Sequence, residues 1–229
     1  MRGDTAKPQT IDAVLFDLDG LLVDSEPVWF RVRTEIFERV GMKWTEADQK
    51  ELMGKSTGAW IEYLGKKLEG KLTKDEVVRQ TLDGMVGAYR NGGVRVMPGA
   101  QEAVRYCKGQ FEMALASGSP RILIEAALEV NGWQKTFRVV LSSDEVPRGK
   151  PAPDVYLEAA KRLGVDPKRC VVVEDSGSGI LAGKAAGAAV IAVPNQELMP
   201  PKEALDKADV RLDSLEEFED ALKQLSGRE

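Results

Sequence analysis

Histidine is absent from the 229 residues of this chain. Its absence excludes Ser-His-Asp and Cys-His nucleophiles, histidine-ligated zinc sites and histidine proton shuttles. The two cysteines, Cys107 and Cys170, are too few for a disulfide framework or a zinc site, and we interpret both as small packed residues. Any chemistry must therefore use carboxylates, lysine, hydroxyls, backbone amides or a hard metal ion.

Long apolar runs and an excess of positive charge are also missing. The longest mostly apolar stretch, residues 185–194, has about half the length that spans a bilayer. Residues 1–10 lack the apolar centre of a signal peptide. The formal net charge of −5 argues against general nucleic-acid binding. We therefore expect a cytoplasmic protein with neither a membrane nor a nucleic acid as partner.

Short apolar runs alternate with amphipathic, helix-length segments along most of the chain. Most runs are continuous, which is typical of strands buried on both faces of a parallel sheet. The predicted strands cover residues 11–16, 111–116, 139–141, 170–173 and 188–193. The predicted helices between them cover residues 99–108, 121–131, 154–163 and 176–186. This alternation predicts an α/β fold with a doubly wound, Rossmann-like parallel sheet.

The alternation stops between residues 25 and 93, where helical segments follow one another without a convincing strand. These segments cover residues 28–40, 45–53, 58–68 and 74–89. Glycine-containing loop signals separate or close them. We interpret residues 25–92 as a helical cap domain inserted after the first strand. The α/β core domain would then consist of residues 1–24 and 93–229.

Charged and hydroxyl side chains follow four of the predicted strands. In chain order they are Asp17 and Asp19, Ser117, Lys150, and Glu174 and Asp175. In an open parallel sheet such positions share one rim, where ligands bind. Four converging carboxylates require a cation, and all-oxygen ligation favours Mg²⁺. Mg²⁺ together with Lys150 predicts a phosphoryl group as the reactive part of the substrate.

The same residues lie in four ordered segments. They are DLDGLLVDSE at 17–26, LASGS at 115–119, GKPAPDVY at 149–156 and VVEDSGSGI at 172–180. Together they resemble the four motifs of the haloacid dehalogenase-like hydrolases, and the helical insert resembles the sugar-phosphatase and β-phosphoglucomutase-like branch. The resemblance implies a Mg²⁺-dependent phosphatase for small phosphorylated metabolites, most plausibly sugar or polyol phosphates, with an aspartyl-phosphate intermediate.

The resemblance also implies a role for each motif residue. Asp17 would attack phosphorus, and Asp19 would protonate the leaving group and then activate water. The implied metal ligands are Asp17, the backbone carbonyl of Asp19 and Asp175, and Glu174 would assist the metal or orient its water. The implied phosphate-binding groups are the Ser117 hydroxyl, the Lys150 ammonium and the backbone amides of Leu18 and Gly118.

Residues of the predicted cap would select the leaving group, because a closing cap excludes water from the site. The candidates are Glu26, Trp29, Gly54, Lys55 and Ser56. Trp29 offers a flat face for a sugar ring, with packing inside the cap as the alternative interpretation. Lys55 has the alternative interpretation of an exposed loop cation. The β-phosphoglucomutases that the chain resembles carry histidine at the place of Trp29, so hydrolysis is favoured and sugar-phosphate mutase activity is the alternative.

Two glycine motifs suggest nucleotide binding instead. Residues 54–57, GKST, resemble the end of a P-loop, but Gln49 stands where the first glycine is required. Gly177, Gly179 and Gly183 follow a strand, yet their last spacing is one residue too long for a dinucleotide loop. A phosphate-ligand binder without catalytic activity is a third hypothesis. For the phosphatase we expect a monomer whose partner is a small phosphorylated molecule.

Overall fold

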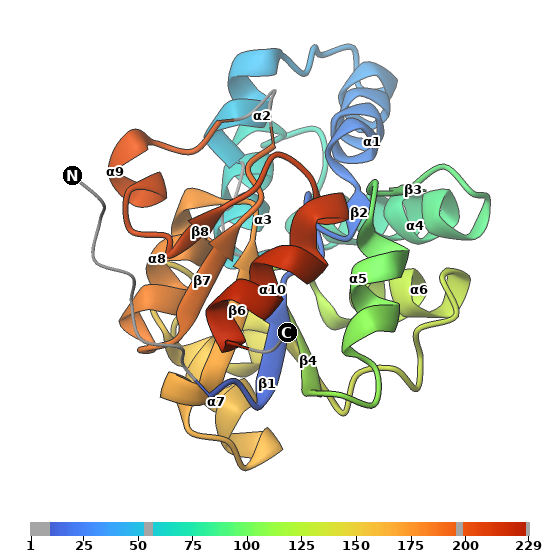
Figure 1. The fold of residues 1–229 in the computed structure, drawn as a ribbon. Helices are drawn as coiled ribbons and strands as arrows, with labels where there is room; N and C mark the ends of the chain where they lie inside the picture. Colours follow the sequence, from blue (N-terminus) through green and yellow to red (C-terminus); the bar gives the residue numbers. More distant parts are fainter. Residues whose placement is uncertain (1–9, 53–56, 196–198, 228–229) are drawn as a thin grey trace.

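A six-stranded parallel sheet forms the centre of the molecule, seen in a computed structural model that describes residues 10–52, 57–195 and 199–227 (Figure 1). The strand order is β5-β4-β1-β6-β7-β8. The strands are β1 (Ala13–Phe16), β4 (Glu112–Ser117), β5 (Val139–Ser142), β6 (Cys170–Glu174), β7 (Ala189–Ala192) and β8 (Val210–Arg211). The doubly wound α/β fold predicted from the sequence is confirmed.

The position of β1 explains why the site forms at its end. All four residues of β1 are buried, and the strand pairs with β4 on one side and β6 on the other. The chain runs outward from β1 to β4 and β5, then crosses back to β6. Ligands of such sheets bind beyond the strand ends at this reversal of direction.

Helices cover both faces of the sheet. The covering helices are α5 (Ala100–Cys107), α6 (Arg121–Val130) and α10 (Phe218–Ser226) on one face, and α7 (Asp154–Leu163) and α8 (Gly177–Ala185) on the other. Val14 packs in the first of these layers and Leu15 in the second. This two-sided burial explains why the apolar runs are continuous rather than alternating. Cys107 and Cys170 are buried free thiols.

Four further helices, here called the cap helices, lie between β1 and β4 in the sequence. They are α1 (Glu26–Arg39), α2 (Glu46–Leu52), α3 (Thr57–Lys67) and α4 (Lys74–Arg90). An antiparallel ribbon of β2 (Val23–Asp24) and β3 (Arg95–Val96) pairs the two connections that join them to the core. In Figure 1, α1 and α2 lie beyond one end of the sheet.

Several elements of the fold were not predicted from the sequence. They are the two strands of the ribbon, β8, the short helix α9 (Lys202–Leu205) and the longer helix α10. Among the described residues, no helix combines the length and apolar character needed to cross a bilayer.

Candidate active site

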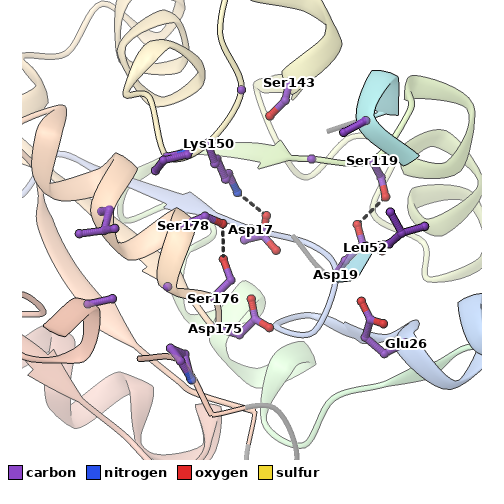
Figure 2. A pocket seen from close by; sticks show the side chains of 18 of the residues that line it. Asp17, Asp19, Glu26, Leu52, Ser119, Ser143, Lys150, Asp175, Ser176 and Ser178 are labelled. Atoms are coloured by element: carbon purple, nitrogen blue, oxygen red, sulfur yellow. Dashed lines mark hydrogen bonds and ion pairs between the residues drawn. The ribbon is translucent and has the colours of Figure 1, made fainter. Parts of the chain in front are cut away.

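The carboxyl end of the sheet and the cap helices enclose a cavity of about 1240 Å³. Asp17, Asp19, Lys150 and Asp175 line it from the core. Residues of α1, α2 and α3 line it from the other side, and the segment containing α9 forms a further wall. Figure 2 shows Asp17 and Asp19 in this space, with Asp175 beside them. The predicted convergence of the strand-end acids therefore occurs in the structure.

Asp17 lies directly after β1, and its backbone amide donates to the Val173 carbonyl at 3.1 Å. Its Oδ1 accepts a 2.5 Å hydrogen bond from Lys150 Nζ, which also donates to Glu174 Oε1 at 2.6 Å (Figure 2 shows the first). Burial raises the pKa of Asp17 to about 8, although Lys150 opposes this. Burial lowers the pKa of Lys150, but Asp17 and Glu174 outweigh it and hold that pKa well above its usual value. The lysine is therefore a permanent cation beside Asp17.

Glu174 ends β6 and is completely buried. Its Oε1 accepts hydrogen bonds of 2.6 Å from Lys150 Nζ and from the Tyr156 hydroxyl. Its Oε2 accepts from the backbone amide and the hydroxyl of Ser176, at 3.2 and 2.9 Å. A Cβ atom on Gly179 would collide with this carboxylate. The glycine that resembled part of a dinucleotide loop is therefore required by the approach of α8 to Glu174.

Asp17, Glu174 and Asp175 form an acidic cluster that fits a metal ion. One carboxylate oxygen from each lies within 4.8 Å of the others. Burial, followed by the neighbouring carboxylates, raises the pKa of Asp175 well above its usual value. Only Asp17 and Glu174 bind the ammonium of Lys150, so a divalent cation would offset the remaining repulsion among the three carboxylates and favour their ionised forms. The oxygen donors match a hard cation.

Three serine hydroxyls hold the carboxylate of Asp19. Ser25 donates to Oδ1 at 2.7 Å, while Ser117 and Ser119 donate to Oδ2 at 3.0 and 2.7 Å (Figure 2 shows the last). Ser117 Oγ also accepts from the amide of Ser119 at 2.9 Å. Ser117, predicted to bind phosphoryl oxygens, is thus completely buried against Asp19. Ser119 and Gly118 line the cavity.

Two of the predicted cap residues, Glu26 and Trp29, lie in α1 and line the cavity. Trp29 is only 6% exposed, and the Arg33 guanidinium lies 4.7 Å from the centre of its ring. Most of the indole therefore packs inside the cap, and little of its surface is left for a ligand. Leu18 is buried, so only its backbone is available for the predicted role. The predicted residues Gly54, Lys55 and Ser56 lie outside the described residues.

No role was predicted from the sequence for Ser25, Ser119 or Tyr156. All three lie within the four motifs, beside residues to which roles were given. The signal was therefore present, but a serine or tyrosine in a motif does not reveal which carboxylate its hydroxyl contacts.

Comparison with known proteins gives matches along most of the chain. A family model described as haloacid dehalogenase-like hydrolase matches residues 11–187. Hexitol phosphatase B of Escherichia coli (strain K12) is 35% identical over 216 residues, which are 92% of this chain and 96% of that protein.

Two further matches are a longer, bifunctional protein and a solved structure. The bifunctional riboflavin kinase/FMN phosphatase of Arabidopsis thaliana is 37% identical over 185 residues, 80% of this chain but 48% of that protein, so this chain spans about half its length. The crystal structure of CbbY from Rhodobacter sphaeroides in complex with phosphate has a TM-score of 0.81 at 29% identity, over 91% of this chain and 96% of that one.

Proposed function

The chain belongs to the haloacid dehalogenase-like hydrolases, and from this membership we propose a Mg²⁺-dependent phosphatase of small phosphorylated metabolites, above all sugar or polyol phosphates. Relatives named as phosphatases, matched over nearly their whole length, make the chain a phosphoric monoester hydrolase. One observation carries the finer proposal: a lysine-paired Asp17 and a serine-held Asp19 line the same cavity.

Asp17 is the nucleophile of the proposed reaction. Its carboxylate oxygen attacks phosphorus, the bond from phosphorus to the leaving oxygen breaks, and an aspartyl-phosphate forms. Lys150, 2.5 Å from Asp17, favours the ionised carboxylate and stabilises negative charge on the transferring group. The backbone of Asp17 is tied to β6, so the nucleophile is held in place before substrate binds.

Asp19 is the general acid and the general base of the proposed reaction. In its protonated form it donates a proton to the leaving oxygen. The resulting carboxylate then takes a proton from the water that attacks phosphorus, which releases phosphate and restores Asp17. The serine hydroxyls orient Asp19 for both transfers.

Asp17, Glu174 and Asp175, together with the backbone carbonyl of Asp19, would hold Mg²⁺. When bound, the ion supplies positive charge for the phosphoryl oxygens. The proposal extends to the setting of the enzyme: a cytoplasmic monomer that binds one small phosphorylated molecule and no nucleic acid or membrane.

The test is release of inorganic phosphate from p-nitrophenyl phosphate and from a panel of sugar and polyol phosphates, with and without EDTA. We expect Mg²⁺-dependent turnover that disappears in Asp17→Asn. Asp83→Asn, which changes an exposed carboxylate of α4, is the matched control and should keep the wild-type rate. Robust turnover by Asp17→Asn would remove the nucleophile assignment.

Two other outcomes would replace the phosphatase with an alternative. A product isomer that exceeds free phosphate, with activation by a bisphosphorylated sugar, would establish a mutase. Binding of phosphorylated ligands without turnover by the wild type would establish a non-catalytic binder.

A further inference from the structure

Gln49 of α2 is buried, and its side-chain amide forms hydrogen bonds with three other side chains, of which Glu26 and Arg33 line the cavity. Its Oε1 accepts hydrogen bonds from Arg33 Nη1 and Trp44 Nε1, both at 3.0 Å, and its Nε2 donates to Glu26 Oε2 at 2.8 Å. Arginine and tryptophan N–H groups can only donate. The orientation of the amide is therefore fixed, and its NH₂ group must face Glu26.

Glu26 presents the other end of this network to the cavity. It lies in the first turn of α1 and lines the cavity, and Figure 2 shows its side chain near Asp19, the proposed acid. Gln49 occupies Oε2, whereas Oε1 has no hydrogen-bond partner among the residues that the structure describes. A hydrogen-bond acceptor is thus held at a fixed place beside the position of the leaving group.

Arg33 supplies the balancing charge from inside the cap. It is 5% exposed, and its guanidinium lies 4.7 and 5.7 Å from the ring centres of Trp29 and Trp44. Burial lowers its pKa to about 10, which leaves it charged at neutral pH. Buried charges are costly unless they are compensated. Glu26, linked to Arg33 through Gln49, provides that compensation, so the three side chains act as one unit.

We propose that Glu26 accepts a hydrogen bond from a hydroxyl of the leaving group, and that Gln49 and Arg33 position it to select uncharged polyol leaving groups over those carrying a second oxyanion. A hydroxyl can donate to the free oxygen of Glu26. A second phosphate or carboxylate cannot, and it would meet this carboxylate close to Asp19. The inference rests on the proposed phosphatase function and names the residues that set its specificity.

Besides the exposed Lys207, which also lines the cavity, Lys50 is a described residue that would support the opposite preference. It lines the same cavity, and it is exposed. An oxyanion on the leaving group would bind the ammonium of Lys50 rather than the carboxylate of Glu26. The two preferences therefore depend on different residues and can be separated by mutation.

The decisive variant is Glu26→Gln. Gln49 would still donate to the side-chain oxygen at position 26, which leaves an NH₂ group, a donor, toward the cavity in place of the acceptor. The measurement is kcat/KM for a hexitol monophosphate and a hexose bisphosphate, with p-nitrophenyl phosphate as a reference. We expect the wild type to prefer the monophosphate, and Glu26→Gln to lower the monophosphate/bisphosphate ratio at least tenfold, mainly through KM.

Gln49→Leu tests the positioning role separately. It should shift the same ratio in the same direction by a smaller factor, with a larger change in KM than in kcat. The control is Gln80→Leu, because Gln80 also accepts from an arginine, Arg39 at 3.1 Å, but on the exposed face of the cap. This control should keep the wild-type ratio, and circular dichroism checks that each variant is folded.

The outcomes distinguish this inference from the proposed function. Absence of Mg²⁺-dependent p-nitrophenyl phosphate hydrolysis by the wild type would refute the phosphatase itself. Normal hydrolysis with an unchanged substrate ratio in Glu26→Gln would refute only the role of Glu26. A wild-type preference for the bisphosphate that disappears in Lys50→Met would establish selection of a second oxyanion instead.

Discussion

The hydroxyl of Ser25 donates a 2.7 Å hydrogen bond to the carboxylate of Asp19 across the junction between the cap helices and the sheet. Ser25 immediately precedes α1, whereas Asp19 follows β1. Ser117 and Ser119, at the end of β4, hold the other oxygen of the same carboxylate. The orientation of the proposed acid is therefore set by both parts of the molecule.

Loss of the Ser25 hydroxyl should lower kcat more for a leaving group that needs a proton than for one that does not. Hydrogen bonds to charged groups contribute about 1.5–3 kcal/mol, and two serines remain, so we expect Ser25→Ala to lower kcat for a polyol phosphate about tenfold. Nitrophenolate departs without needing a proton, so p-nitrophenyl phosphate should lose less. Steady-state kinetics on both substrates check this. Ser226→Ala, which removes a hydroxyl at the end of α10, is the control. Equal losses on both substrates would contradict the prediction.

Metal removal should inactivate the enzyme and lower its thermal stability together. A ligand at one hundred times its Kd stabilises the folded state by about 2.7 kcal/mol, so saturating Mg²⁺ should raise Tm relative to EDTA. Asp175→Asn, which changes one acid of the cluster, should weaken both effects. Asp83→Asn, on the exposed side of α4, should respond like the wild type. Activity that is the same in EDTA and in Mg²⁺ would exclude a required metal.

The hydroxyl of Tyr156 should stabilise the fold, because it donates a hydrogen bond to the buried carboxylate of Glu174. It gives Glu174 a 2.6 Å hydrogen bond, and its ring lies 5.0 Å from Lys150 Nζ. Tyr156→Phe keeps the ring and leaves Glu174 with one donor fewer, so we expect the free energy of unfolding to fall by about 1–3 kcal/mol. Urea denaturation measures this. An unchanged midpoint would show that the hydroxyl is dispensable for stability.

The main strands were predictable because burial on both faces leaves a continuous apolar run. The predicted run at 170–173 differs from β6 (Cys170–Glu174) by a single residue. The two-residue strands β2 (Val23–Asp24) and β3 (Arg95–Val96) are too short to show any period, and they form because the connections to the cap helices lie side by side. For these two strands, the length of the element, rather than its composition, limited the prediction.

The acids of the site were predictable for a topological reason, whereas their partners were not. Strand ends of a parallel sheet share one rim, so Asp17 and Glu174 had to converge. Gln49 contacts Glu26 across 23 positions of sequence and Arg33 across 16, and both contacts depend on how α1 packs on α2. No periodic pattern records that packing, which is why Gln49 entered the sequence analysis only as a mismatch to a P-loop.

Asp48, the neighbour of Gln49, makes the stability of the cap helices depend on pH. Its carboxylate accepts hydrogen bonds from the Thr45 hydroxyl and the Tyr63 hydroxyl, each at 2.7 Å, and from Lys67. Burial raises the pKa of Asp48, but these hydrogen bonds outweigh it and hold the pKa below its usual value. The ionised form is therefore the one that stabilises the fold.

A carboxyl group with a lowered pKa in the folded state contributes stability above its unfolded pKa of about 3.9, and the contribution is lost as the pH falls. We expect Asp48→Asn to lower the free energy of unfolding at pH 7 by about 1–3 kcal/mol, toward the lower end because the Lys67 side chain is 39% exposed and solvent screens its charge. The difference from the wild type should shrink below about pH 4. Denaturant titrations at pH 7, 5 and 3.5 measure it, with Asp83→Asn as the control. A difference that stays constant down to pH 3.5 would mean that the charge of Asp48 contributes nothing and that only the shape of its side chain matters.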